Sequence, residues 1–232
     1  RLSKKYNLVN IDTGATYRCV TLEMMNQNIG MDEEEKIAEM LKSIQIELST
    51  EKGKQKVFLN GQDVTDKIRS KEVSANVSPV SSIKQVRLAM GGLQRKMAQG
   101  KDVIMEGRDI GTVIFPNADV KIYLDANVEV RAKRRVKQNE EKGIEMSYEE
   151  VLENIKKRDK NDMEKEMGAL KVAEDAVVID GSEMTIKEVE KAISNVIDKK
   201  LKAKKEQEKI YWVRPETTWK KIERATIKAI LH

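Results

Sequence analysis

The sequence contains almost no cysteine and almost no histidine. Cys19 is the single cysteine, and His232, the last residue, is the single histidine. One thiol excludes a disulfide framework and a zinc site built from several thiolates, and it fits a reducing cytoplasm. A lone terminal histidine excludes Ser–His and Cys–His nucleophile pairs and metal sites made of several imidazoles. Chemistry in this chain must therefore rest on arginine, lysine, aspartate, glutamate or backbone groups.

Long apolar runs are absent as well. No stretch approaches the ~20 apolar residues that a membrane-spanning helix needs, and no apolar segment near Arg1 is typical of a secretory signal. We therefore expect a cytoplasmic protein that is not embedded in a membrane. Hydrophobic residues still make up 39% of the 232 residues, and charged residues make up 36%. This composition allows one packed domain, with room for an inserted subdomain, under a very polar surface.

Positive charge is concentrated near the C-terminus. The net charge is +5, and residues 198–232 contain 11 Lys and Arg against 5 Asp and Glu. The remaining body is nearly neutral and lacks the broad basic face of nucleic-acid-binding proteins, so we expect no nucleic-acid partner. After a Lys-rich linker at 199–209, the residues from Trp219 to Leu231 have the spacing of a basic amphipathic helix. Residues 210–232 could contact an anionic membrane surface, dock on the body, or begin a second domain.

The order of predicted elements indicates an α/β fold with a parallel sheet flanked by helices. Short apolar runs alternate with helical patterns along most of the chain, and a first strand is expected at 6–12. The later runs are 102–105, 120–124 and 176–180, and the helices that follow them are 128–142, 147–162 and 185–199. A small antiparallel insert is expected near 43–61, where alternating residues lead to the hairpin turn Asn60-Gly61. Ligands of such parallel sheets bind beyond the carboxyl ends of the strands.

Two motifs fall at those strand ends. The first is Asp12-Thr13-Gly14-Ala15-Thr16-Tyr17-Arg18, in which a tight turn leads from a strand into a helix. The helix N-terminus favours an anion, and an arginine can grip a phosphate through two N–H groups. The second motif is Glu106-Gly107-Arg108-Asp109, where opposite charges stand beside glycine just past a buried strand. Either motif could also be a plain structural turn.

Arginines also gather on two predicted helices. Arg131, Arg134 and Arg135 have i, i+3, i+4 spacing and share one helix face, although that face could simply be solvated. On the next helix, an apolar stripe continues into Arg158, Asp162 and Lys165, so these charges follow the inward face. Inward arginines suggest an anion in a cleft. Phosphoryl transfer suits this inventory, because it depends on positioning and charge neutralisation more than on covalent help.

Taken together, these motifs resemble the bacterial cytidylate kinase family. The matching stretches run in order from Arg1 to about Lys200 and include DTGATYR at 12–18, EGRDIGTVIFP at 106–116, RAKRR at 131–135 and KKRDKND at 156–162. The resemblance implies a P-loop nucleoside-monophosphate kinase fold, with the antiparallel insert in the nucleoside-monophosphate (NMP) domain and a helical lid. It also implies transfer of the ATP γ-phosphoryl group to CMP or dCMP with Mg²⁺, in a monomeric enzyme.

The resemblance also assigns roles to particular residues. Thr13, Tyr17 and Arg18 would face the acceptor nucleotide. Ser78, Arg108 and Asp109 would bind its cytosine and sugar, and Arg87 would bind its phosphate. Arg158 and Asp162 would lie at the acceptor end of the cleft. The residues acting in catalysis would be Arg131, Arg134 and Arg158. Arg134 and Arg135 would bind the donor, and no residue is expected to be a dedicated metal ligand.

The implied domains are a core made of 1–14, 90–130 and 167–198, an NMP domain at 15–89, a lid at 131–166, and the tail at 199–232. Two alternatives stay open. One is a nucleotide-binding fragment without catalytic activity, and the other is the kinase part of a bifunctional protein joined to a lipid acyltransferase, which the start of the tail faintly resembles.

The sequence departs from the family pattern in two places, and each departure has an expected effect on the protein. Lys165 stands where the family usually has arginine, which keeps the charge and loses the two-pronged fork. The motif GxxxxGK[ST], which cradles donor phosphates, does not occur in the sequence. We therefore expect an N-terminally truncated chain whose missing strand would lie between 102–106 and 120–124. Unpaired edges on those two strands would leave the chain poorly folded and without turnover.

Overall fold

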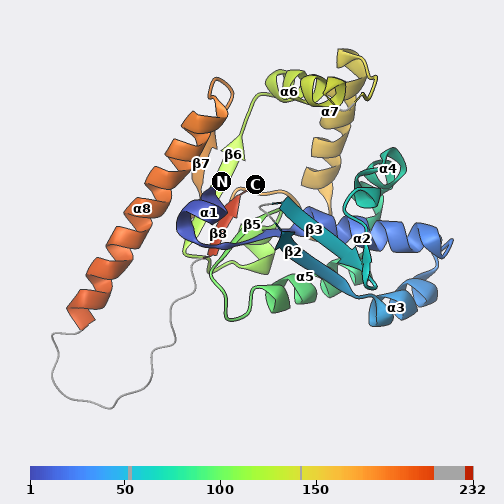
Figure 1. Cartoon of the computed structure of the whole chain (residues 1–232), viewed down its shortest axis with the longest axis horizontal. Coiled ribbons are helices and arrows are strands. Elements are labelled where there is room, and N and C mark those ends of the chain that lie inside the picture. The colour runs from blue at the N-terminus through green and yellow to red at the C-terminus, as the bar shows by residue number, and fades with distance from the viewer. Residues whose placement is uncertain (52–53, 142, 212–227, 232) are drawn as a thin grey trace, which may run out of the picture.

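A five-stranded parallel sheet forms the centre of the molecule (Figure 1). The computed structural model describes residues 1–51, 54–141, 143–211 and 228–231. The strand order is β1-β5-β8-β6-β7. The strands are β1 (Val9–Asp12), β5 (Val103–Glu106), β6 (Val120–Asp125), β7 (Val177–Asp180) and β8 (Lys228–Leu231). The predicted α/β fold with a parallel sheet is confirmed, and the first strand begins at Val9 because Tyr6 still belongs to helix α1 (Leu2–Tyr6).

Helices cover both faces of this sheet. Ile104 on β5 packs with Ile193 and Ile197 of helix α8 (Ile186–Tyr211), on the face that α1 also covers. Its neighbours Val103 and Met105 belong to the opposite core, with residues of the short π-helix η2 (Ile110–Ile114). Successive residues of a strand point to opposite faces, so a continuous apolar run in β5 fills both cores.

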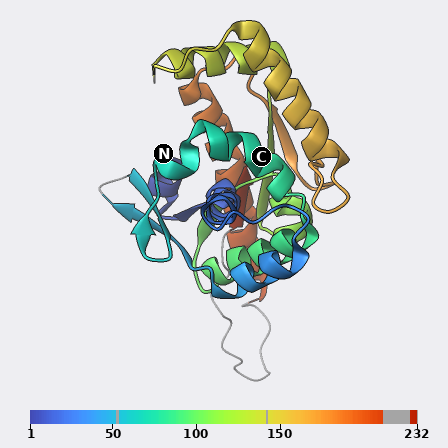
Figure 2. The ribbon, with the colours of Figure 1, turned by 90° about the vertical axis from the view of Figure 1, so that its right-hand side faces the viewer.

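A second body of helices and an antiparallel sheet follows β1. Its elements are α2 (Thr13–Asn26), α3 (Glu34–Ser43), β2 (Ile46–Glu51), β3 (Lys54–Leu59), β4 (Gln62–Asp63), the 3₁₀ helix η1 (Lys67–Arg69), α4 (Lys71–Val80) and α5 (Lys84–Met97). Figure 2 shows this sheet beside the helices. The turn between β3 and β4 is the predicted one, since Asn60 and Gly61 both have positive φ, 50° and 80°.

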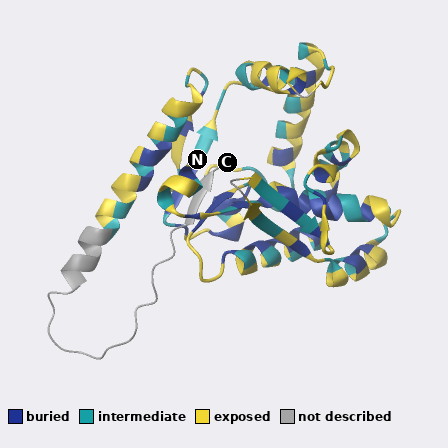
Figure 3. Cartoon of the chain, in the orientation of Figure 1, coloured by how far each residue is buried: buried dark blue, intermediate teal, exposed yellow. Residues whose placement is uncertain are grey.

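Helices α6 (Val128–Glu140) and α7 (Tyr148–Glu164) form a hairpin that stands away from the sheet (Figures 1 and 2). Asn127 caps α6 by accepting a hydrogen bond from the backbone of Glu129. Ser147 and Glu150 form a capping box at the start of α7. Most of the hairpin surface is exposed (Figure 3), whereas the first three residues of β5 and of β6 are buried. The hairpin covers the range predicted as the lid, and the domain boundaries themselves stay predictions.

The C-terminal segment differs from its prediction. Helix α8 continues to Tyr211, through the stretch that was expected to be a linker, because Lys, Glu, Gln and Ala are all good helix formers. Residues 228–231 form strand β8, so the amphipathic helix expected to reach Leu231 is wrong there. The rest of that predicted helix, with Trp219, lies outside the described residues.

Strand β8 also corrects the prediction of unpaired edges. It lies between β5 and β6, in parallel with both, and Ala229 is in register with Ile104 and with Val120. Inner strands need a hydrogen-bonding neighbour on each side, since an unsatisfied backbone group costs about 1–3 kcal/mol. The chain supplies that neighbour from its own C-terminal segment. Within the described part of the chain, no helix is both long and apolar enough to cross a membrane.

Candidate functional site

The two motifs at the strand ends meet in the structure. Strands β1 and β5 are adjacent, with Asp12 in register with Glu106. The Asp12 side chain accepts a hydrogen bond from the Ala15 backbone at 3.1 Å and so caps α2. The Thr13 hydroxyl donates to the Glu106 carbonyl at 2.6 Å. A Cβ atom on Gly107 would lie 2.4 Å from the Thr13 hydroxyl, so this approach requires glycine.

A buried ion pair lies behind this junction. Arg87 on α5 donates to the Asp109 carboxylate, and each side chain is only 5% exposed. The guanidinium group of Arg87 lies over the ring of Tyr17, 5.4 Å from its centre. Burial raises the pKa of Tyr17 to about 12, so its hydroxyl stays protonated. These three side chains form a neutral, dry wall rather than an exposed positive charge.

Asp162 on α7 gathers three cations. Its carboxylate lies 2.9 Å from Arg108 Nε, 2.9 Å from Lys165 Nζ and 3.8 Å from Arg158 Nε. The Asp162 side chain is only 4% exposed, so its charge is satisfied by these partners rather than by water. Lys165 also donates to the Ser81 hydroxyl at 2.9 Å, and this bond joins the end of α7 to the end of α4.

These contacts close into a ring. Arg87 donates from Nη1 to the Ser81 carbonyl at 3.2 Å, which connects the buried pair to the Asp162 contacts. We call the following set the charged ring: Ser81, Arg87, Arg108, Asp109, Asp162 and Lys165. It joins α4, α5, the loop after β5 and α7. Elements far apart in the sequence are therefore held around one space beyond the carboxyl end of β5.

Arginines crowd around the same space. We call the following set the arginine cluster: Arg18, Arg69, Arg108, Arg135 and Arg158. Burial first, and then the Arg69 and Arg135 charges, lower the pKa of Arg18. Desolvation by surrounding protein, followed by the Arg108 and Arg18 charges, lowers the pKa of Arg158, although half of that side chain still reaches solvent. Arg108 and Arg158 also share the Asp162 carboxylate, and like charges that act on one another are stabilised by an anion between them.

The structure holds Arg18 in place within that cluster. Its Nη1 donates to the Ile68 carbonyl at 3.1 Å and to the Ser74 hydroxyl at 2.9 Å. Arg69, the last residue of η1, lies beside Ile68, and its Nη2 is 3.8 Å from the Asp12 carboxylate. Asp12 and Glu106 are a second pair of like charges. Desolvation by surrounding protein, followed by the Asp12 charge, raises the pKa of Glu106, although that side chain is exposed.

Arg131 and Arg134 have partners of different kinds. Arg131 binds the Asp159 carboxylate at 2.7 Å and donates to the Ala126 carbonyl at 2.9 Å. Arg134 donates to three carbonyls in the loop before α8, those of Gly181 (2.7 Å), Ser182 (3.0 Å) and Met184 (3.2 Å). Both side chains line a cavity of about 300 Å³ at the end of β6, together with Arg108 and Tyr123. Arg131 and Arg134, which were predicted to share one helix face with Arg135, therefore contact different partners.

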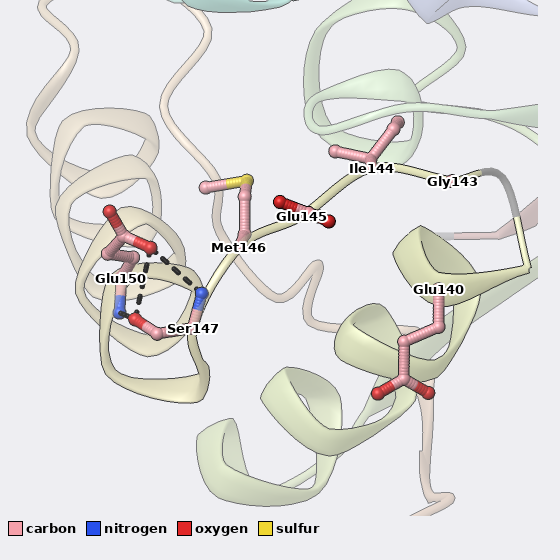
Figure 4. Close-up of a pocket in the computed structure, with 7 residues that line it drawn as sticks. All are labelled: Glu140, Gly143, Ile144, Glu145, Met146, Ser147 and Glu150. Atoms are coloured by element: carbon pink, nitrogen blue, oxygen red, sulfur yellow. Dashed lines mark hydrogen bonds between the residues drawn. The ribbon is translucent and has the colours of Figure 1, made fainter.

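A larger, more open hollow of about 660 Å³ lies at the far end of the α6–α7 hairpin (Figure 4). Three glutamates line it, Glu140, Glu145 and Glu150, beside Met146 and the capping residue Ser147. Carboxylates repel phosphate, so this hollow does not suit a nucleotide. The charged ring and the arginine cluster are the better candidate site.

Most of the predicted residues lie around that site. Thr13, Tyr17, Arg18, Arg108, Asp109, Arg158 and Asp162 belong to the junction, the ring or the cluster. Ser78 lies one turn before Ser81 and accepts from its hydroxyl through the backbone carbonyl, at 2.8 Å. Arg87 is the exception to its expected role, since it is buried against Asp109 and Tyr17 instead of being open to a phosphate.

The sequence did not single out Arg69, Ser81 or Gln94, and it placed Lys165 on the inward face of its helix without giving it a role in the site. Ser81 and Gln94 carry no local signal, because their partners lie on other elements. Lys165 gave a weak signal, since it stands three residues after Asp162 on the inward stripe of the helix. These residues become visible only in three dimensions.

Comparison with known proteins gives consistent matches. A family model described as cytidylate kinase matches residues 1–199. A cytidylate kinase of Caldicellulosiruptor saccharolyticus is 49% identical over 188 residues, which is 81% of this chain and 83% of that protein. Cytidylate kinases of Bacillus subtilis and Fusobacterium nucleatum are 45% and 44% identical. These alignments cover 86% and 85% of this chain and 89% of each relative.

Proposed function

The chain belongs to the cytidylate kinase family, and from this premise we propose that the charged ring and the arginine cluster form its acceptor-nucleotide site. The fold is that of the P-loop nucleoside-monophosphate kinases, and the reaction is transfer of the γ-phosphoryl group of ATP to CMP or dCMP. The observation that carries the proposal is the convergence of Arg108 and Arg158 on Asp162, beside the buried Arg87–Asp109 pair, with Arg18 within electrostatic range of Arg158.

The two ends of this site suit the two ends of a nucleotide. Arg18, Arg108 and Arg158 meet the acceptor phosphate, because guanidinium groups bind phosphate oxygens through paired N–H bonds. The neutral wall of Arg87, Asp109 and Tyr17 suits the base, since a dry site strengthens hydrogen bonds to an uncharged ring. This places Arg87 at the base end, with Ser78 beside it, instead of at the phosphate.

The sugar then falls between these ends. Asp162 accepts hydrogen bonds from a ribose or deoxyribose hydroxyl as Arg158 shifts toward the phosphate, since Arg158 is the most distant of its three cations at 3.8 Å. Thr13 fixes the turn on which the acceptor rests, through its bond to the Glu106 carbonyl.

The donor side involves the α6–α7 hairpin. Arg131 and Arg135 are carried toward the donor phosphates when the hairpin closes, which excludes water from the reaction. Arg131 first has to leave Asp159. Arg134 anchors α6 to the loop before α8 through its three carbonyl partners, so its contribution to donor binding is indirect. Phosphoryl transfer needs no histidine, because positioning and charge neutralisation supply most of the rate.

A kinase of this family uses a divalent cation with ATP, and Mg²⁺ is the proposed ion. Mg²⁺ is usually held by substrate phosphates and one or two carboxylates. Asp12 and Glu106 would hold the ion, because their carboxylates end neighbouring strands, and this departs from the expectation that no residue is a dedicated metal ligand. When bound, the ion neutralises charge on the transferred phosphate.

A cytoplasmic, monomeric enzyme is part of the same proposal, in keeping with the buried free thiol of Cys19. Contact with a membrane would involve only residues 210–232. Among the described contacts, we find none that favours the inactive-fragment or the acyltransferase hypothesis over this one.

Calorimetric titration of the chain with CMP, dCMP and AMP tests the acceptor site. We expect CMP and dCMP to bind at least about tenfold more tightly than AMP, a difference of about 1.4 kcal/mol. The wall of Arg87 and Asp109 discriminates between bases, whereas the arginines bind any 5′-phosphate. Equal or tighter binding of AMP would contradict the assignment.

A further inference from the structure

A buried glutamine stands behind the proposed acceptor site. Gln94 lies on α5 and is 0% exposed, which is unusual for an amide side chain. Its Nε2 donates to the Thr16 hydroxyl on α2 at 3.0 Å. An amide removed from water costs free energy unless its groups are hydrogen-bonded, so a residue of this kind in a core usually has a specific task.

The contacts of Gln94 continue to the strand-end junction. The Thr16 hydroxyl that accepts from Gln94 donates in turn to the Thr13 carbonyl at 2.7 Å. The Thr13 hydroxyl donates to the Glu106 carbonyl at 2.6 Å. Glu106 is followed directly by Gly107 and Arg108, the start of the loop that carries Asp109. A chain of three hydrogen bonds therefore connects α5 through the first turn of α2 to this loop.

The other end of the Gln94 amide is close to Tyr17. Gln94 Oε1 and the Tyr17 hydroxyl are both buried, and neither has a hydrogen-bond partner among the described residues. Burial raises the pKa of Tyr17, and the Gln94 side chain acts in the opposite direction. The ring of Tyr17 in turn lies under Arg87, the partner of Asp109. Both ends of the amide therefore face residues of the acceptor site.

We propose that Gln94 is a positioning residue for the acceptor nucleotide. Its amide fixes Thr16 on α2 through a hydrogen bond and lies beside Tyr17, so that α2 keeps one spacing from the loop of Arg108 and Asp109. The inference rests on the proposed function, because it assumes that the nucleotide binds between these walls. A methionine of similar length would fill the same space without fixing either group.

The test measures CMP affinity by calorimetry and stability by denaturant unfolding, on the full chain. The variants are Gln94→Met, Thr16→Val and the double variant. We expect each single variant to weaken CMP binding about tenfold, the effect of one typical hydrogen bond. The double variant should bind CMP no more weakly than the single variant with the lower affinity, because each substitution removes the same hydrogen-bonded link. Thr16→Ser keeps the hydroxyl and should bind CMP as the wild type does.

Thr21→Val is the matched control. Thr21 is also fully buried on α2, and its hydroxyl donates within the helix, to the Tyr17 carbonyl at 2.9 Å. The control should lose stability but keep CMP affinity within about twofold. The inference is overturned if Gln94→Met binds CMP within about twofold of the wild type, or if Thr21→Val loses as much affinity as Gln94→Met. Failure of the wild-type chain to bind CMP would instead overturn the proposed function.

Discussion

Asp162 holds more positive charge than one carboxylate can neutralise. Arg108 and Lys165 are at hydrogen-bond distance from it, whereas Arg158 lies 3.8 Å away and is half exposed. If the proposed function holds, an arriving phosphate recruits Arg158 at the smallest cost to the ring. Arg108 is tied more closely and has to remain in contact with Asp162 to keep the ring closed.

Replacing Arg158 tests this division. Arg158→Ala should weaken CMP binding by about 1.5–3 kcal/mol, the strength of a hydrogen bond to a charged group, and should leave stability almost unchanged. Lys160→Ala, on the same helix with a 72% exposed side chain, is the control and should change neither. Titration calorimetry and thermal unfolding supply the two measurements. Normal affinity with a large loss of stability would mean that Arg158 serves the fold alone.

Glu106 makes stability depend on pH. Desolvation by surrounding protein and the Asp12 charge raise its pKa above the ordinary value of 4.5, although the Glu106 side chain is exposed, so the expected effect on stability is small. Folding therefore favours the protonated carboxyl. Its contribution to the free energy of unfolding is complete below pH 4.5 and is lost as the pH rises through the raised pKa. Glu106→Gln should make the protein more stable than the wild type at pH 7, and the gap should close near pH 4. Denaturant unfolding at both pH values checks this, and a gap that widens at low pH would refute it.

At the scale of elements, helix α7 depends on its first turn. Ser147 and Glu150 exchange hydrogen bonds there, from the Ser147 backbone to Glu150 at 2.8 Å and from the Glu150 backbone to the Ser147 hydroxyl at 3.2 Å. This capping box lies at the far end of the hairpin, whereas Arg158 and Asp162 lie near the other end. The cap thus sets the stability of the helix that carries two site residues.

Ser147→Ala should destabilise the protein by about 1 kcal/mol, since it removes one half of the box. Hydrogen exchange should speed up in the first turn of α7, and CMP affinity should change little, because the proposed substrate contacts, Arg158 and Asp162, are near the other end. Hydrogen-exchange mass spectrometry with and without CMP measures both effects. Unchanged exchange at residues 147–151 would show that the box contributes nothing.

The elements that the sequence predicted well are those with a signal inside one segment. Helix α6, strand β6 and the Asn60-Gly61 turn follow from periodicity or turn chemistry that a short window contains. The charged ring has no such signal, because Ser81 and Lys165 are 84 residues apart in the chain. Resemblance to a family supplied the residues of the site, and only the fold supplied their partners.

At the scale of the whole molecule, β8 completes the sheet. Its prediction failed because a four-residue strand has almost no pattern of its own, and Lys228–Leu231 also continued a helical spacing. What decides its structure is the demand for partners from β5 and β6, which lie more than a hundred residues earlier. Tertiary context therefore outweighs local preference at this position.

A proline in β8 tests its contribution. Ala229→Pro removes a backbone donor between two neighbouring strands and should destabilise the fold by about 3 kcal/mol or more. Ala229→Gly keeps the donor and should cost only about 1 kcal/mol, so it serves as the control. Chemical denaturation compares the two variants. Equal, small effects would mean that β5 and β6 do not rely on this strand.

The place of β8 also has a consequence for synthesis on the ribosome. The strand in the middle of the sheet is translated after its four companions, since β7 ends at Asp180 and β8 begins at Lys228. At roughly 5–20 residues per second, the nascent chain waits several seconds with an open slot between β5 and β6. During this delay the two strand edges are exposed to neighbouring chains, so chaperone binding to the nascent protein should be strongest before residues 228–231 emerge.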